Sequence, residues 1–78
     1  MNKKQIKEDI RNMDAIVGRN VLHLRKKRKV TRLYMAAKLG ISQQQLHKYE
    51  AGHNRISSGS LHKISEVLNV PFAFFFVG

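Results

Sequence analysis

Apolar residues recur with the period of an α-helix in the first half of the chain. Val17, Val21 and Leu24 lie at positions i, i+4 and i+7, which places their side chains on one helical face. Asp14 precedes this run and is the expected N-cap, and the helix is expected to end near residues 29–30. A helix with one apolar face must bury that face against other elements of the chain.

Two short helices are expected next. The first is capped by the hydroxyl of Thr31 and ends at Gly40, where a left-handed residue is favoured. The second is capped by Ser42 and stops at Gly52. The apolar residues expected to face inward from this region are Met35, Ala36, Leu39, Ile41, Leu46 and Tyr49.

A fourth helix and a short last helix are expected in the final third of the chain. Ser57 or Ser58 supplies the cap of the fourth helix, and Asn69 is expected to adopt the left-handed conformation after it. Pro71 is expected to open the last short helix, which runs to Phe76. The inward face of the fourth helix comprises Leu61, Ile64 and Leu68. Because no stretch alternates with period two for long enough to form a strand, the predicted fold class is all-α, with four or five helices.

The first twelve residues differ from the rest. Ile6, Ile10 and Met13 have helical spacing, but they stand among many charged residues. Residues 1–12 are therefore interpreted as a basic N-terminal arm or helix extension, and residues 13–78 as one domain. No apolar run reaches the ~18 residues that cross a bilayer, and no signal peptide is recognisable. We expect a cytoplasmic, nucleoid-associated protein with no membrane partner.

Basic residues are concentrated in the first half of the chain. The 78 residues carry 15 Lys and Arg against 5 Asp and Glu, a formal charge of +10. Cations near residues 25–29 suit the C-terminal end of a helix dipole, but five in a row are more typical of a nucleic-acid patch. So large a positive charge favours a phosphate-bearing partner. A chain this short also excludes a catalytic cleft between two lobes.

Residues 32–51 contain a spaced motif, RLYMAAKLGISQQQLHKYEA. Its structural positions are Ala36, Gly40, Ile41, Leu46 and Tyr49, with Glu50 after them. Ala36 is small enough for two helices to cross closely, and Gly40 takes the positive φ of the turn without steric cost. This joint pattern resembles the helix-turn-helix of the phage repressor and Cro proteins, the XRE family. The resemblance extends over roughly residues 17–76 and implies a compact lambda-repressor-like domain, with the motif as helices two and three.

The resemblance implies that the chain binds double-stranded DNA. In this motif the third helix of the domain enters the major groove with its first residues on base edges. A glutamine amide can donate to N7 of adenine and accept from its N6 amino group. The expected base contacts are Gln43, Gln44 and Lys48, followed by Gln45 and His47. If the motif were absent, the three glutamines would be interpreted as part of an ordinary solvated helix face.

Expected phosphate contacts flank this helix. They are Arg32, Ser42, Asn54 and Arg55. Family members often pair an arginine that ends helix one with a glutamate after the recognition helix, and Arg25 and Glu50 stand at these positions. Many members carry glutamine where Arg32 stands, so this chain lacks one of the two glutamines that usually brace helix three.

No residue pattern indicates catalysis, a metal or a cofactor. The four histidines (His23, His47, His53 and His62) match no common zinc spacing, and the chain contains no cysteine, so surface histidines are expected. If Glu50 binds Arg25, no acidic residue is available to orient a Ser–His pair. We expect a protein that is not an enzyme and that has no small-molecule ligand.

The segment 70–77 contains four phenylalanines. The rings at 74, 75 and 76 spread around a helix and cannot all face one core. One interpretation is that Phe72 with Phe75 or Phe76 covers the core and one ring is merely exposed. We favour burial of the surplus ring in a homodimer, because operators of this family are usually two-fold symmetric.

The predicted function is a sequence-specific DNA-binding transcriptional regulator, with a repressor of a two-fold symmetric operator favoured. One alternative is an antitoxin-type protein that neutralises a toxin partner and autoregulates, although no toxin-binding tail is visible. A second is a nucleic-acid binder that uses charge alone, which would not need the glutamines of the motif.

Overall fold

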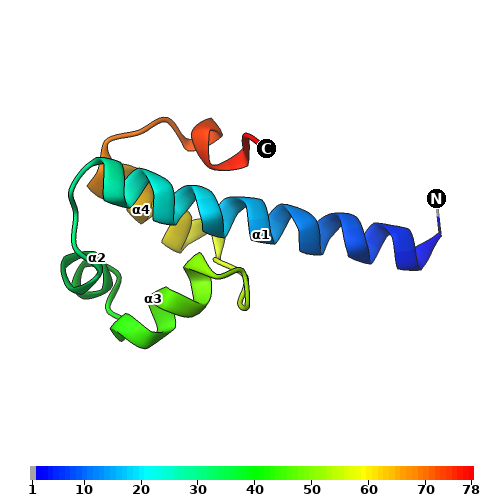
Figure 1. The fold of residues 1–78 in the computed structure, drawn as a ribbon, viewed down its shortest axis with the longest axis horizontal. Helices are drawn as coiled ribbons and strands as arrows, with labels where there is room; N and C mark the ends of the chain where they lie inside the picture. The colour runs from blue at the N-terminus through cyan, green and yellow to red at the C-terminus, as the bar shows by residue number, and fades with distance from the viewer. Residues whose placement is uncertain (1) are drawn as a thin grey trace.

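The computed structural model describes residues 2–78, which form four α-helices and one 3-10 helix (Figure 1). The elements in chain order are α1 (Lys3–Lys27), α2 (Arg32–Leu39), α3 (Gln43–Glu50), α4 (Ser58–Leu68) and η1, the 3-10 helix (Phe72–Phe76). No strand occurs in the part of the chain that the structure describes. The predicted all-α fold is confirmed.

The helix α1 is longer than the sequence pattern predicted. It has 25 residues, which corresponds to about 37 Å at 1.5 Å per residue. Asn2 is its N-cap and accepts a hydrogen bond of 2.8 Å from the backbone N–H of Gln5. The prediction that Asp14 caps this helix is wrong, because an earlier cap exists and no glycine or proline interrupts residues 3–14. The N-terminal part of α1 projects beyond the other helices (Figure 1).

At its other end α1 stops at Lys27, two to three residues before the predicted end. The starts of α2, α3 and α4 and the ends of α2 and α4 follow the predicted signals. Thr31, Ser42 and Ser57 cap α2, α3 and α4, and each hydroxyl accepts a hydrogen bond of 3.0–3.1 Å from the backbone N–H three residues later. Gly40 and Asn69 adopt the left-handed conformation after α2 and α4, with φ of 68° and 53°. These caps satisfy backbone groups that a helix end would otherwise leave unpaired.

One hydrophobic core is shared by all five elements. Its buried members are Val17, Val21, Met35, Ala36, Leu46, Leu61, Ile64, Leu68, Val70 and Phe75. Leu39, Ile41 and Tyr49 pack against it and are half-buried, so Ile41 is less deeply buried than expected. Full burial of a large apolar side chain contributes about 1.5–3 kcal/mol, and α1 and α4 together supply half of these residues.

The segment η1 folds back along α1. The side-chain amide of Asn20 in α1 donates hydrogen bonds to the carbonyl oxygens of Phe75 and Val77, at 2.7 and 2.8 Å. Pro71 precedes the 3-10 helix rather than forming its first residue. Within η1 only Phe75 is buried, and three rings remain exposed by 40–50%: those of Phe72, Phe74 and Phe76. More than one ring is therefore left uncovered.

Candidate nucleic-acid interface

The helix α3 has one buried face and one open face. Leu46 and Glu50 are buried against the body of the domain. Four of the five predicted base-contact side chains lie on the exposed side, at positions i, i+1, i+4 and i+5: Gln43, Gln44, His47 and Lys48. This spacing places two amides, an imidazole and an ammonium on one surface, where they can donate to the acceptors of base edges and phosphates.

The fifth predicted base contact, Gln45, has a different environment. Its side chain is half-buried, and its amide nitrogen donates a 3.0 Å hydrogen bond to the Oδ1 atom of Asn54. The amide of Asn54 in turn donates to the carbonyl of His53 at 2.9 Å. Gln45 and Asn54 therefore join α3 to the loop that follows it, and sequence reasoning did not foresee this pairing.

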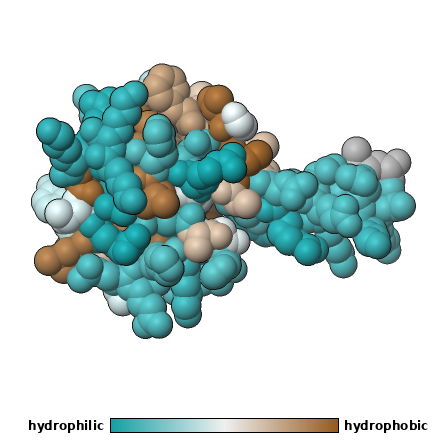
Figure 2. Space-filling model, viewed as in Figure 1, coloured by the Kyte–Doolittle hydropathy of each residue, from teal (hydrophilic) through white to brown (hydrophobic). Residues whose placement is uncertain are grey.

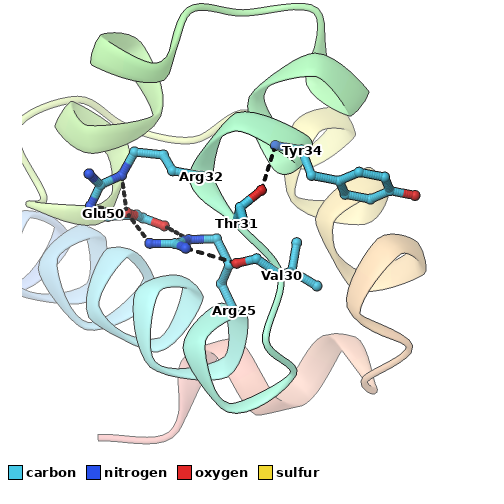
Figure 3. A network of polar contacts seen from close by, with 6 residues as sticks. All are labelled: Arg25, Val30, Thr31, Arg32, Tyr34 and Glu50. Atoms are coloured by element: carbon cyan, nitrogen blue, oxygen red, sulfur yellow. Dashed lines mark hydrogen bonds and ion pairs between the residues drawn. The ribbon is translucent and has the colours of Figure 1, made fainter.

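A buried carboxylate fixes the end of α3 (Figure 3). Arg25 donates to Glu50 through Nε at 2.6 Å and through a terminal nitrogen at 3.3 Å. The other terminal nitrogen of Arg25 donates to the carbonyl of Val30 at 2.9 Å. Both side chains of the pair are nearly excluded from solvent, with 7% and 2% exposure. The pairing expected from the family pattern is thus present, and it ties the ends of α1 and α3 together.

Arg32 approaches the same carboxylate from α2. Its Nε and a terminal nitrogen both lie 3.2 Å from the Oε1 atom of Glu50 (Figure 3). Its side chain remains 35% exposed, unlike that of Arg25. In this chain the start of α2 and the end of α3 are therefore braced by an ion pair instead of two glutamines. The open part of the guanidinium is the part that could still approach a phosphate.

Arg55 follows α3 and lies over α1. Its Nε forms an ion pair of 3.0 Å with the Oδ2 atom of Asp14, which stands in the middle of α1. The side chain of Arg55 is 70% exposed. Asp14 thus orients this predicted phosphate contact without removing it from solvent.

Two helix starts add partial positive charge to this surface. Thr31 and Ser42 are both exposed, and the first backbone N–H groups of α2 and α3 follow them. Tyr34, in the first turn of α2, is exposed and lies under the ammonium of Lys38, which is 5.3 Å from the ring centroid. In Figure 3 the ring of Tyr34 points away from the Glu50 network. Sequence reasoning did not select Tyr34, although the predicted cap at Thr31 already places it in the first turn of α2.

The basic run of residues 25–29 divides into two parts. Arg25 is buried in the ion pair, whereas Lys26, Lys27, Arg28 and Lys29 are exposed at the C-terminal end of α1. Arg28 reaches the carbonyl of Asn69 at 3.4 Å, so this end of α1 adjoins the end of α4. The run complements the helix dipole, and its four exposed cations add diffuse positive charge.

The crossing of α1 and α3 requires a glycine. Gly18 is buried in α1, and a Cβ atom at this position would lie 2.3 Å from the carbonyl oxygen of Tyr49 and 3.2 Å from that of Glu50. No ordinary contact is so short, so a larger residue would force α3 away from α1. Gly18 therefore sets how closely α3 packs on the domain.

Across residues 2–78, no three His, Asp or Glu side chains come together in a way that could hold a metal ion. Over the same residues, no helix is long and apolar enough to cross a membrane.

Comparisons with known proteins relate these features to a family. A family model described as helix-turn-helix matches residues 22–75. A transcriptional regulator in the ATPase CF(0) region of Rhodospirillum rubrum is 40% identical over 67 residues, which cover 86% of this chain and 62% of that protein. An HTH-type transcriptional regulator of Rickettsia conorii is 36% identical over 69 residues, which cover 88% of this chain and 55% of that protein. The chain thus spans less than two thirds of the length of these relatives.

A solved structure shares the fold. The crystal structure of the restriction-modification controller protein C.AhdI from Aeromonas hydrophila superposes with a TM-score of 0.72, covering 80% of this chain and 94% of that chain. The two sequences are 18% identical, so the similarity concerns the fold alone. It confirms the predicted lambda-repressor-like arrangement of helices.

Proposed function

Because the chain belongs to the helix-turn-helix family, we propose that it acts as the DNA-binding module of a transcriptional regulator. The main observation in favour is the open face of α3, where Gln43, Gln44 and Lys48 lie together while the opposite face is fixed by Leu46 and Glu50. A rigid helix with exposed amides at its start has the geometry that major-groove recognition requires.

The expected division of labour on α3 follows from these environments. Gln43 and Gln44 read adenine through their free amides, and Lys48 contacts guanine or a phosphate one turn later. His47 lies on the same open face and is a further candidate for a base edge. Gln45 supports the loop after α3 through its hydrogen bond with Asn54, so we assign it a positioning role.

Phosphate contacts would surround this helix and fix its register on the duplex. Arg55 is the strongest candidate, because its guanidinium is 70% exposed and is held by Asp14. The backbone N–H groups that follow Thr31 and Ser42 attract anions at two further points. Tyr34 and the open part of Arg32 stand near the first of these points.

We further propose that the protein acts as a homodimeric repressor on a two-fold symmetric operator. The exposed rings of η1 support this, because Phe74 is 50% exposed and Phe72 and Phe76 are each 40% exposed. Hydrophobic atoms gather over η1 at the upper edge of the view in Figure 2. Exposed aromatic surface of this kind is typical of protein–protein contacts.

Selection of bound fragments from genomic DNA at physiological salt tests the proposed function. We expect enrichment of a short two-fold symmetric sequence that binds at least about 10³-fold more tightly than a shuffled duplex. The control is a variant with both Gln43→Ala and Gln44→Ala, which should bind the two duplexes much more equally. If no sequence is enriched and the wild type binds both duplexes alike, the protein is a charge-driven nucleic-acid binder and the proposal is wrong.

A further inference from the structure

The apolar face of α1 continues beyond the part that the domain covers. Ile6, Ile10, Met13, Val17 and Val21 follow one another at intervals of four, three, four and four residues, which keeps them on one face of a straight helix. Val17 and Val21 are buried in the core. The first three are exposed by 43%, 45% and 40%. From here on the arm denotes residues 3–13 of α1, in place of the residues 1–12 predicted from the sequence, and these three side chains are its apolar stripe.

The stripe joins the exposed part of η1. A cavity of about 210 Å³ lies between the base of the arm, η1 and the start of α4, and residues of all three line it together. Its apolar lining residues are Met13, Val17, Ile56, Leu61, Phe72 and Phe76. The rings of Phe72 and Phe76 lie 5.6 Å apart between centroids. Stripe and rings therefore form one continuous apolar patch at the place where the arm leaves the domain.

The size of the patch fits an interface. Five side chains, the stripe together with Phe72 and Phe76, each expose 40–45% of their surface. At ~200 Å² for each whole side chain they leave roughly 400 Å² of apolar surface in water, which is in the range of functional patches on monomeric proteins. A standard interface buries about 800 Å² per partner, of which somewhat more than half is apolar. The patch thus supplies the apolar share that a stable dimer needs.

We propose that a second copy of this chain covers the patch, with the two arms packed side by side in antiparallel orientation. This proposal rests on the proposed homodimer. It adds a second contact to that dimer, in addition to the contact proposed for the exposed ring of Phe74. A two-fold axis places the same patch on both sides of the interface, so each stripe lies against the other. In the register with Ile10 opposite Met13 of the second copy, Ile6 of each arm reaches the cavity at the base of the other.

The charges beside the stripe favour the antiparallel orientation. On one flank, Lys7 and Asp14 are two turns apart and line a shared hollow, whose other lining residues are Ile10, Arg11 and Arg55. Antiparallel arms bring the same flank of both helices together, and Lys7 of each copy would then lie toward Asp14 of the other. In parallel arms this flank would meet the opposite flank of the second copy, and Asp14 would face Asp9 there instead of a cation. Asp14 already binds Arg55, but its side chain keeps 23% exposure, which leaves room for a second cation from the other copy.

A charge introduced into the stripe tests the contact. Ile10→Glu should raise the dissociation constant of the dimer at least about tenfold, measured by sedimentation equilibrium, because a carboxylate would be buried without a partner. Asn12→Glu adds the same charge to an exposed position of the same arm, away from the stripe, and should leave the constant unchanged. Circular dichroism should show nearly equal helical content in both variants. Equal dissociation constants for Ile10→Glu and the wild type would overturn the proposal.

Disulfide formation tests the orientation, since the chain contains no cysteine of its own. In the proposed register, residue 10 of one copy lies opposite residue 13 of the other. A mixture of Ile10→Cys and Met13→Cys proteins should therefore form cross-linked heterodimers faster than either variant forms homodimers. If the heterodimer is not favoured, the antiparallel arrangement is wrong.

Failure of this inference can be distinguished from failure of the proposed function. A wild-type dimer that Phe74→Glu dissociates and Ile10→Glu does not would exclude the arm contact while leaving the homodimer in place. A wild type that is monomeric at tens of micromolar, the range in which a contact of about −6 to −7 kcal/mol is visible, would exclude both contacts. Selective binding of operator DNA by that monomer would still support the proposed DNA-binding function.

Discussion

Arg25 and Glu50 join the C-terminal ends of α1 and α3 through a buried contact of 2.6 Å between Nε and Oε2. Glu50 receives a second guanidinium from Arg32, so one carboxylate links three helices. The angle of α3 is therefore set by charge as well as by the packing of Leu46. An ion pair this deep adds little net stability, but loss of one partner leaves the other charge buried alone.

The first prediction concerns this carboxylate. Glu50→Gln keeps the side-chain volume but removes the negative charge that compensates Arg25 and Arg32. We expect the free energy of unfolding to fall by about 3–5 kcal/mol, because Arg25 stays buried without a counter-charge. Urea denaturation followed by circular dichroism measures this change. Glu66→Gln on the exposed surface of α4 is the control and should change stability by no more than about 0.5 kcal/mol. Similar losses in the two variants would show that the Glu50 network is unimportant.

The second prediction compares two helical glycines. A Cβ at Gly18 would meet the carbonyl oxygen of Tyr49 at 2.3 Å, whereas a Cβ at Gly59 in α4 has no neighbour within 4 Å. Gly18→Ala should therefore destabilise the domain by at least about 1–3 kcal/mol, despite the better helix propensity of alanine. Gly59→Ala should stabilise it by up to about 1 kcal/mol. Thermal unfolding of both variants should give shifts of opposite sign, and a stabilising Gly18→Ala would contradict the proposed close crossing.

The sequence predicts those helix starts and ends that depend on a capping residue close by in the chain. The starts of α2 and α3 follow from Thr31 and Ser42, and the end of α2 follows from Gly40, because each acts on backbone groups within a few residues. The start of α1 lies twelve residues before the start that the cap signal of Asp14 predicts, because Asn2 caps the helix and residues 3–14 contain no helix breaker. In the structure Asp14 binds Arg55 instead, which a local pattern cannot show.

The part of the candidate site that can be predicted from the sequence is the part set by the 3.6-residue period of a helix. The open face of α3 follows from the burial of Leu46 and the spacing of the polar residues around it. The pairing of Gln45 with Asn54 and that of Arg32 with Glu50 join residues 9 and 18 positions apart in the sequence. Such contacts depend on how a loop or a neighbouring helix packs, so they became visible only in the folded chain.

The third prediction tests base recognition by α3. Gln44→Ala should weaken binding to the selected operator by about 1–3 kcal/mol and leave binding to a shuffled duplex nearly unchanged, because a lost base contact affects only the matching sequence. Fluorescence anisotropy with the two duplexes measures both affinities. Gln5→Ala removes the same amide from the arm and should have no selective effect on the operator. Equal losses on both duplexes would exclude a base contact by Gln44.

The fourth prediction separates phosphate contact from base contact. Arg55→Ala should lower the affinity for all sequences and reduce the slope of log K against log salt by about 1, because one fewer counterion is displaced from DNA. Lys63→Ala, which removes an exposed cation from α4, serves as the control and should leave the slope unaltered. Loss of the exposed pair with Asp14 should cost at most about 1 kcal/mol of stability. An unchanged slope for Arg55→Ala would place this residue off the DNA.

The last prediction concerns the exposed ring of η1. Phe74→Glu places a charge at a ring that is 50% exposed and that we assign to the dimer contact, where an unpaired carboxylate is costly to bury. Its neighbour Phe75 is fully buried, so the core of the domain does not depend on Phe74. Phe74→Glu should therefore keep the helical content and the unfolding temperature of the wild type.

Dimer formation and operator binding should fall together in this variant, because each half-site would then be bound without help from the neighbouring copy. Sedimentation at matched concentrations measures the first change, and anisotropy on a full operator measures the second. Binding to a single half-site is the internal control and should match the wild type, since α3 is untouched. If Phe74→Glu dimerises as well as the wild type does, the ring lies outside the contact and the exposed phenylalanines belong to a surface for another protein.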